Sequence, residues 1–362
     1  MVNKDDTPET NSFFSSGAYG CVHYPRIKCN GTQKKINDGK RKDGLVSKLV
    51  IYDSKSKNEY LLGKKLKPTD ILKNNPIVVV ERKCDIKTNA AKNIMNKYKK
   101  CKRVLDRKRD KKYKHVLFFS KYYKSITAKD YIYENFSIKK MVKYFYFCIY
   151  ISNILKSFGV VHNDMHMNNV LYDEKKGNFH LIDFGLAIDL DNVYVNMDKN
   201  KINYKYLKGV LVEHEVKWLP SSIEHHILNH FVYSTHALNS IELMNIINIY
   251  YNELKAKPWI LGIEDYDSYK KEIYDYYSEL FLTNGSTDKH ISEIIFKSTY
   301  SWDVYRAAIS CLNIIESFHY DKMDIFNLSE LKKILRDCLH YNYNIRTSPE
   351  KLLKKITSLS LL

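Results

Sequence analysis

The sequence predicts an α+β protein with a small β-rich N-terminal lobe and a larger, mainly helical C-terminal lobe. Short apolar and β-branched runs dominate the first third of the chain, and helical periodicity dominates the rest. A hydrophobic content of 44% over 362 residues is enough for a sizeable core. We expect a disordered polar tail over 1–11, an N-terminal lobe over 12–124 and a C-terminal lobe over 125–362.

The N-terminal lobe is expected to be rich in strands. Residues 13–24 (FFSSGAYGCVHY) have small residues between apolar ones, as in a strand–turn–strand unit. Residues 45–52 (LVSKLVIY) and 76–81 (PIVVVE) have the composition of strands. A helical pattern covers 58–66, and a further short strand is predicted at 116–119.

The C-terminal lobe is expected to be helical apart from two short strands. Residues 137–158 predict one long apolar helix, which Gly159 would end. The strands are predicted at 170–172 and 180–182. Helical segments then continue towards the end of the chain.

The formal net charge of +18 lies in the first third of the chain. Residues 1–115 contain 30 Lys/Arg and 12 Asp/Glu, whereas the rest contains 29 of each. The excess gathers in two basic insertions, 25–44 and 97–114. A solvated helix with i,i+4 pairs is the favoured interpretation of the second, and docking of an acidic or nucleic-acid-associated substrate is the alternative. No sequence-specific nucleic-acid binding is expected.

The seven cysteines are dispersed and include no C-x-x-C pair. This spacing predicts neither a zinc site nor a disulfide framework, and it favours a reducing compartment. The N-terminal residues are polar, which does not fit a secretory signal. The most apolar stretch, 144–155, is too short to span a bilayer. We therefore expect a soluble, cytoplasmic protein.

The residues best suited to catalysis and metal binding lie in the segment 162–187 (HNDMHMNNVLYDEKKGNFHLIDFGLA). Asp164 is followed five residues later by Asn169, and Asp183 comes fourteen residues after that. Carboxylate or amide groups separated by a β-hairpin can converge on divalent cations, and a third carboxylate can accept a hydroxyl proton. This arrangement suits phosphoryl transfer.

The His-x-Asp-x-x-x-x-Asn spacing followed by Asp-Phe-Gly resembles the catalytic and metal loops of the protein-kinase superfamily. The resemblance implies a bilobal kinase-like fold, ATP bound between the lobes, and Mg²⁺ or Mn²⁺ as the metal. It makes Asp164 the base and Asn169 and Asp183 the metal ligands. The catalytic loop would be 162–169, and the activation segment 183–224.

Upstream residues resemble the family's glycine-rich loop, G-x-G-x-x-G-x-V, with a serine in place of the first glycine. The residues expected to cover the ATP phosphates are Ser15, Gly17, Ala18, Tyr19, Gly20 and Val22. Lys48 would pair the α- and β-phosphates, and Glu59 would hold Lys48. Gly63 lies one turn after Glu59 and predicts a mobile helix, since glycine costs about 1 kcal/mol there relative to alanine.

Three further residues resemble structural parts of the kinase helical lobe. Glu224, in Ser-Ile-Glu, stands where Ala-Pro-Glu usually stands, and Arg346 resembles the arginine that pairs with this glutamate. Asp303 resembles the helix aspartate that holds the catalytic loop. The resemblance therefore extends over roughly residues 12–355.

Two positions depart from the family pattern. Asn163 replaces the arginine that reads a phosphate on the activation segment, so we expect no need for such phosphorylation. His166 replaces a lysine that contacts the transferred phosphate. A histidine can still donate a hydrogen bond there, and its charge would depend on pH. We therefore count His166 with Asp164 and Lys48 as catalytic candidates.

The expected activity is that of a monomeric serine/threonine protein kinase acting on protein substrates. H-x-D-x-H-x-x-N also resembles small-molecule kinases of the aminoglycoside and choline type, and a pseudokinase binding module is the third alternative. The composition, rich in Lys, Asn, Ile and Tyr, and GAYGCVHYPRIKCNG resemble serine/threonine kinases encoded by large cytoplasmic DNA viruses. That resemblance implies the host cytoplasm or the virion as the location of a viral protein.

Overall fold

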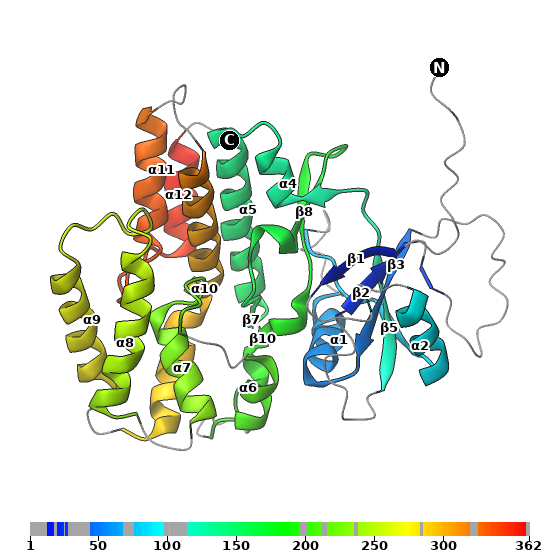
Figure 1. Ribbon diagram of the computed structural model, residues 1–362, viewed down its shortest axis with the longest axis horizontal. Coiled ribbons are helices and arrows are strands. Elements are labelled where there is room, and N and C mark those ends of the chain that lie inside the picture. The colour runs from blue at the N-terminus through cyan, green and yellow to red at the C-terminus, as the bar shows by residue number, and fades with distance from the viewer. Residues whose placement is uncertain are drawn as a thin grey trace. The chain divides into compact units, whose positions relative to one another are not determined.

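The structure is a computed structural model. It describes residues 13–17, 20–24, 26–27, 44–67, 76–97, 101, 114–195, 201–211, 216–234, 238–282, 285–318 and 325–359. The predicted tail, Ala18, Tyr19 and most of both basic insertions lie outside these residues. The chain divides into two compact units, one formed by residues 1–125 with 182–185 and the other by 126–181 with 186–362. The predicted fold class is confirmed, with a small β-rich N-terminal part and a larger helical C-terminal part (Figure 1).

The first unit contains an antiparallel five-stranded sheet in the order β1-β2-β3-β5-β4 (Figure 1). Its strands are β1 (Phe13–Gly17), β2 (Gly20–His23), β3 (Leu45–Ile51), β4 (Arg82–Asp85) and β5 (His115–Lys121). Its helices are α1 (Ser54–Leu66) and α2 (Thr88–Lys97). β3 lies between β2 and β5, with Lys48 opposite Val22 and Phe118.

Helix α1 begins four residues before the predicted start, because Asp53 caps it. The Asp53 carboxylate accepts the backbone N–H of Ser56 at 3.0 Å, and the Ser56 hydroxyl accepts that of Asp53 at 2.9 Å. Gly63 is buried within this helix, and the predicted mobility of the helix stays a prediction. A Cβ there would lie 2.5 Å from the Val80 carbonyl oxygen, so Gly63 allows close backbone packing.

The predicted strand over 76–81 is wrong. Only an isolated bridge at Ile77 forms there, and β4 follows at Arg82–Asp85. Pro76 has no backbone N–H to donate, and the Val80 backbone packs against Gly63 of α1. The Val80 side chain is buried in a hydrophobic cluster with Val50, Val116 and Phe118, so this segment packs without forming a regular strand.

The second unit is mainly helical. Its helices are α4 (Ala128–Tyr133), α5 (Ile138–Ser157), α6 (Tyr204–Val210), α7 (Ile223–Tyr233), α8 (Ser240–Lys255), α9 (Tyr266–Phe281), α10 (Thr287–Ser317), α11 (Ile325–Asp337) and α12 (Pro349–Ser358). Its strands are β6 (Ile126–Thr127), β7 (Val160–Val161), β8 (Val170–Asp173), β9 (Asn178–Leu181) and β10 (Ile188–Asp189). They form the sheets β6-β8-β9 and β10-β7.

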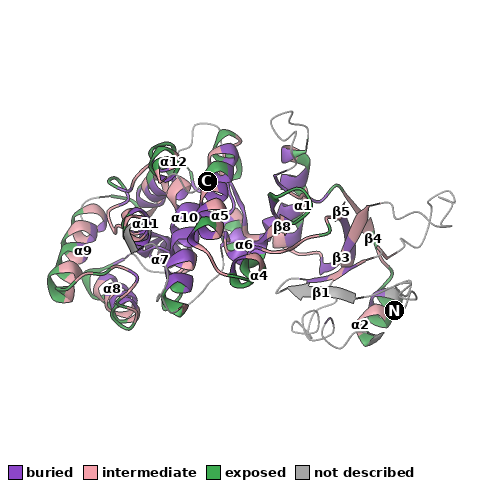
Figure 2. Ribbon diagram, turned by 90° about the horizontal axis from the view of Figure 1, so that it is seen from above, coloured by how far each residue is buried: buried purple, intermediate pink, exposed green. Residues whose placement is uncertain are grey.

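Helices α5 and α10 form the core of this unit, and Figure 2 shows α10 largely in the colour of buried residues. The prediction for α5 is confirmed. The Ser137 hydroxyl caps its start by accepting the Lys140 N–H at 3.2 Å, and Gly159 follows its end at a φ of 63°. None of the helices in the described residues has both the length and the apolarity needed to cross a membrane.

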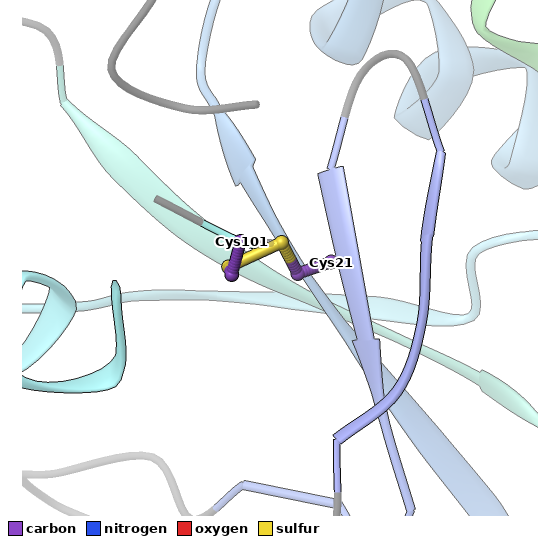
Figure 3. Close-up of a disulfide and its surroundings, with 2 residues drawn as sticks. All are labelled: Cys21 and Cys101. Carbon is purple, nitrogen blue, oxygen red and sulfur yellow. A yellow bond between two sulfur atoms is a disulfide. The ribbon is translucent and has the colours of Figure 1, made fainter. Parts of the chain in front are cut away.

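A disulfide joins Cys21 of β2 to Cys101 in the first unit (Figure 3), so the expectation of no disulfide is wrong for this pair. The two cysteines are 80 residues apart, and both are fully buried in one hydrophobic cluster. Spacing along the chain did not indicate the bond, because packing against the sheet brings the residues together. Cys148, Cys311 and Cys338 are free and buried in the second unit.

Replacing Cys101 with serine is expected to destabilise the protein. Loop-closure entropy for an 80-residue separation predicts a loss of about 4 kcal/mol in the free energy of unfolding. Denaturant unfolding would measure it, and non-reducing peptide mapping would identify the cross-link. The Cys21→Ser/Cys101→Ser double variant should lose no more than either single variant. An unchanged free energy of unfolding in Cys101→Ser would contradict the assignment.

Candidate active site

The first unit places Lys48 between two carboxylates. The Lys48 ammonium lies 3.1 and 3.3 Å from the two Glu59 carboxylate oxygens and 3.0 Å from Asp183 Oδ1. The three residues come from β3, α1 and the Ile182–Gly185 segment. Residues far apart in the chain thus form one ionic cluster, here called the lysine cluster.

Burial and neighbouring charges together shift the pKa values of the lysine cluster. Burial alone would lower the pKa of Lys48, but the charges of Asp183 and Glu59 outweigh it and raise this pKa above its ordinary value. Burial raises the pKa of Glu59 to about 7, although the Lys48 ammonium opposes the shift. The cluster holds two carboxyl groups for one ammonium.

Local backbone structure brings Asp183 to Lys48. Asp183 has a φ of 64°, in the left-handed region that costs a non-glycine residue energy. Gly185 follows closely, and a Cβ at that position would lie 3.3 Å from Asp183 Oδ1. The glycine of Asp-Phe-Gly therefore leaves room for the aspartate carboxylate.

The second unit brings together Asp164, Asn169 and His166, here called the loop cluster. The Asn169 side-chain amide donates to the Asp164 carbonyl oxygen and to Asp164 Oδ2, both at 3.0 Å. His166 Nδ1 accepts the backbone N–H of Asn168, and its Nε2 lies 3.7 Å from Asp164 Oδ2. In the neutral ring the proton is therefore on Nε2, on the side of Asp164.

Asp303 of α10 anchors the start of the catalytic loop. Its two carboxylate oxygens accept the backbone N–H groups of His162 and Asn163, each at 2.8 Å. Burial raises the pKa of Asp303, and these hydrogen bonds oppose the shift. Asn163 has a φ of 57°, so the anchor stabilises a strained backbone next to Asp164. The predicted role of Asp303 in holding the loop is confirmed by these contacts.

Arg306, one turn further along α10, was missed in the sequence. Its guanidinium donates to Asn163 Oδ1 at 3.2 Å and to the Ser221 hydroxyl at 3.0 Å. It also lies 3.9 Å from Asp164 Oδ1. The spacing Asp303-x-x-Arg306 places both residues on one face of a helix, and this could have pointed to Arg306.

A cavity of about 320 Å³ opens beside Asp164 in the second unit. The apolar and aromatic residues that line it include Tyr133, Trp218 and Ile314. Basic side chains also line it, including Lys129, His166 and Arg306. Trp218 is half exposed. A side chain or small molecule that presents a hydroxyl to Asp164 could contact this cavity.

The predicted pair of Glu224 and Arg346 is confirmed. The Arg346 guanidinium binds both Glu224 carboxylate oxygens, at 2.6 and 2.9 Å. The Trp302 indole N–H also donates to Glu224, at 2.9 Å. Burial alone would lower the pKa of Arg346, but Glu224 raises it. This bidentate pair is inside the helical unit and stabilises it.

The residues that resemble a glycine-rich loop are described only in part. Ser15 and Gly17 lie in β1, and Gly20 and Val22 lie in β2. A Cβ at Gly20 would lie 2.7 Å from the Leu49 carbonyl oxygen. Packing within the sheet thus already requires this glycine, and its predicted contact with phosphate remains a prediction.

Each unit offers one oxygen donor of the kind that divalent cations prefer, Asn169 in the second unit and Asp183 in the first. Asn169 uses its amide nitrogen on Asp164, which leaves its amide oxygen as the atom able to coordinate, and Asp183 supplies a carboxylate. Mg²⁺ is often held by one or two such groups together with substrate phosphates. Within the described ranges, no group of three or more His, Cys, Asp or Glu residues could hold a metal by itself.

A family model, described as the ABC1 atypical kinase-like domain, matches residues 115–202. The matched part contains Asp164, Asn169 and Asp183, and it supports a place for the chain in the protein-kinase-like superfamily. The match covers roughly a quarter of the chain. No curated protein sequence matches the chain. The resemblance to viral serine/threonine kinases therefore stays a prediction.

Replacing Arg346 with alanine should destabilise the second unit strongly. Removing one partner leaves the fully buried Glu224 carboxylate uncompensated, which typically costs about 3–5 kcal/mol. Denaturant unfolding would measure the loss. Lys355→Ala is the matched control, because its pair with Asp337 is partly exposed and should contribute little. Equal stabilities of the two variants would contradict the account.

Proposed function

We propose that the protein transfers the γ-phosphate of ATP to a hydroxyl group. The observation that carries this proposal is the placement of Lys48 against both Glu59 and Asp183. Burying an ammonium and two carboxylates costs free energy, so stability of the fold alone does not explain this cluster. The same groups suit the binding of a polyphosphate and its cation. The match to a kinase-like domain supports the same chemistry.

Each cluster has its own task in this proposal. Lys48 neutralises the α- and β-phosphates, and Glu59 keeps its ammonium in place. Asp164 orients the acceptor hydroxyl and takes its proton, while His166 donates to the transferred group through Nε2. Asp183 and Asn169 would hold Mg²⁺, which would neutralise charge on the phosphates when bound. The proposal requires the lysine cluster and the loop cluster to act on one nucleotide.

We propose serine and threonine side chains of proteins as the acceptors. Two features support a protein substrate: the Glu224–Arg346 pair of the helical lobe and the open cavity with half-exposed Trp218 beside Asp164. A small-molecule acceptor is the second candidate, because the matching family model is an atypical kinase-like domain. The same cavity is large enough for a small alcohol.

Replacing Asp164 with asparagine should lower kcat for phosphoryl transfer by about 10²–10⁴-fold, the usual contribution of a general base. Transfer of labelled γ-phosphate to casein, a basic protein, choline and an aminoglycoside would measure it. Asp275→Asn is the matched control, because Asp275 is exposed on α9. Lys48→Met should also abolish transfer, whereas Lys139→Met at an exposed position of α5 should not.

The outcomes of this assay distinguish a protein kinase, a small-molecule kinase and a binding module. Protein labelling that is lost in Asp164→Asn and Lys48→Met supports the protein kinase. Turnover of choline or aminoglycoside without protein labelling would move the assignment to the small-molecule candidate. Absence of both transfer and ATP binding would refute the proposal, and ATP binding without transfer would leave a binding module.

ATP affinity should fall as the pH is lowered through about 7. The pKa of Glu59 is raised to about 7 by burial, so its carboxylate is charged above this pH and neutral below it. A neutral Glu59 no longer attracts the Lys48 ammonium, so Lys48 is held less firmly against the phosphates.

Calorimetric titration with Mg²⁺·ATP between pH 5.5 and 8.5 would test this dependence. Glu59→Gln is the control, because it cannot titrate at position 59. The terminal phosphate has its own ionisation in this range, and it cancels when the two profiles are compared. Identical pH profiles for the two proteins would contradict the role of Glu59.

A further inference from the structure

We propose that Arg306 is a positioning residue that holds the catalytic loop in its active conformation without a phosphate on the activation segment. The inference rests on the proposed function, since it concerns the loop that carries Asp164. It assigns a role to a buried cation on α10 that the kinase resemblance does not supply.

Arg306 links three segments of the second unit. One guanidinium nitrogen donates both to Asn163 Oδ1 and to the Ser221 hydroxyl, and the other terminal nitrogen lies 3.9 Å from Asp164 Oδ1. Ser221 is buried near the end of the predicted activation segment, two residues before α7. The guanidinium therefore contacts the catalytic loop and the end of the segment at once.

Asn163 extends this link to the start of the segment. Its side-chain amide accepts from Arg306 and donates to the Leu186 carbonyl oxygen at 3.3 Å, directly after Asp-Phe-Gly. Its left-handed backbone, at a φ of 57°, needs contacts that favour it. Asn163 and Arg306 together connect α10, the catalytic loop and both ends of the described part of the segment.

The energetics do not favour a purely structural role for Arg306. Its side chain is only 7% exposed, and its Nε has no hydrogen-bond partner among the described residues. Burial lowers the pKa of Arg306, and Asp164 and Asp303 oppose the shift. An incompletely satisfied buried guanidinium typically stabilises a fold less than an apolar side chain would. The contacts of Arg306 with Asn163 and Asp164 therefore point to a role in positioning the loop.

Arg306 supplies a positive charge that the catalytic loop itself lacks at Asn163. In the kinase resemblance, an arginine precedes the base and reads a phosphate, and here that position is Asn163. Arg306 supplies a cation at the same loop from a rigid helix, and it uses the Ser221 hydroxyl and the Asp164 carboxylate as its partners. Because the Arg306 guanidinium already contacts the loop, a phosphate on the activation segment is not needed to hold the loop in place.

Two variants of Arg306 test the proposal. Arg306→Lys keeps the charge but loses the planar fork, and Arg306→Gln removes the charge. We expect kcat to fall about tenfold or more in Arg306→Gln and less in Arg306→Lys, with the KM for ATP unchanged within about twofold. Glu316→Gln is the control, because Glu316 is exposed on the same helix.

Hydrogen exchange gives a readout that does not depend on activity. Arg306→Gln should increase amide exchange in 162–169 and 218–222 and leave α12 unchanged. Wild-type protein treated with a phosphatase should keep its full activity. Unchanged exchange in 162–169, an unchanged kcat or loss of wild-type activity on phosphatase treatment would overturn the proposal. If the wild type transfers no phosphate, the proposed function fails, and exchange alone decides whether Arg306 holds the loop.

Discussion

Charge that is buried must be compensated by buried charge, and this constraint organises both units of the protein. In the first unit, Lys48 is compensated by Glu59 and Asp183. In the second unit, Arg346 is compensated by Glu224, and both side chains are buried. An uncompensated charge at any of these places would cost several kcal/mol, so each pair requires the elements that carry it to pack together.

The buried charges are balanced in the Glu224–Arg346 pair but not in the lysine cluster of the candidate active site. The Glu224–Arg346 pair is balanced and closed, with both side chains almost completely buried. The lysine cluster has one carboxyl group more than it has cations, and the Asp183 side chain is 24% exposed. A carboxylate that is partly open to solvent beside a buried ion pair can accept a divalent cation, whereas a closed pair cannot. This difference separates the candidate site from the structural pair.

The sequence predicted most of the candidate site, because its parts are short motifs with fixed spacing. Asp164 and Asn169 lie in one loop, so five residues of spacing were enough to bring them together. The pairing of Lys48 with Glu59 followed from the resemblance and from the apolar strand around Lys48. The β-rich and helical parts followed from periodicity, as α5 with its cap and terminal glycine shows.

The remaining features depend on contacts that spacing does not encode. The Cys21–Cys101 disulfide and the approach of Val80 to Gly63 both arise from packing around the sheet and α1. For the same reason a β-branched run at 76–81 did not become a strand. Arg306 is one of several charged residues on α10, and only the folded helix shows that it contacts Asn163.

Binding of ATP with and without Mg²⁺ tests the central claim most directly, which is that the lysine cluster binds a polyphosphate together with a cation. Calorimetry on the wild type and on Asp183→Asn would measure it. The account predicts that Mg²⁺ tightens ATP binding by about tenfold or more in the wild type, and that Asp183→Asn removes this gain. ATP binding that does not respond to Mg²⁺, or that responds equally in both proteins, would contradict the account.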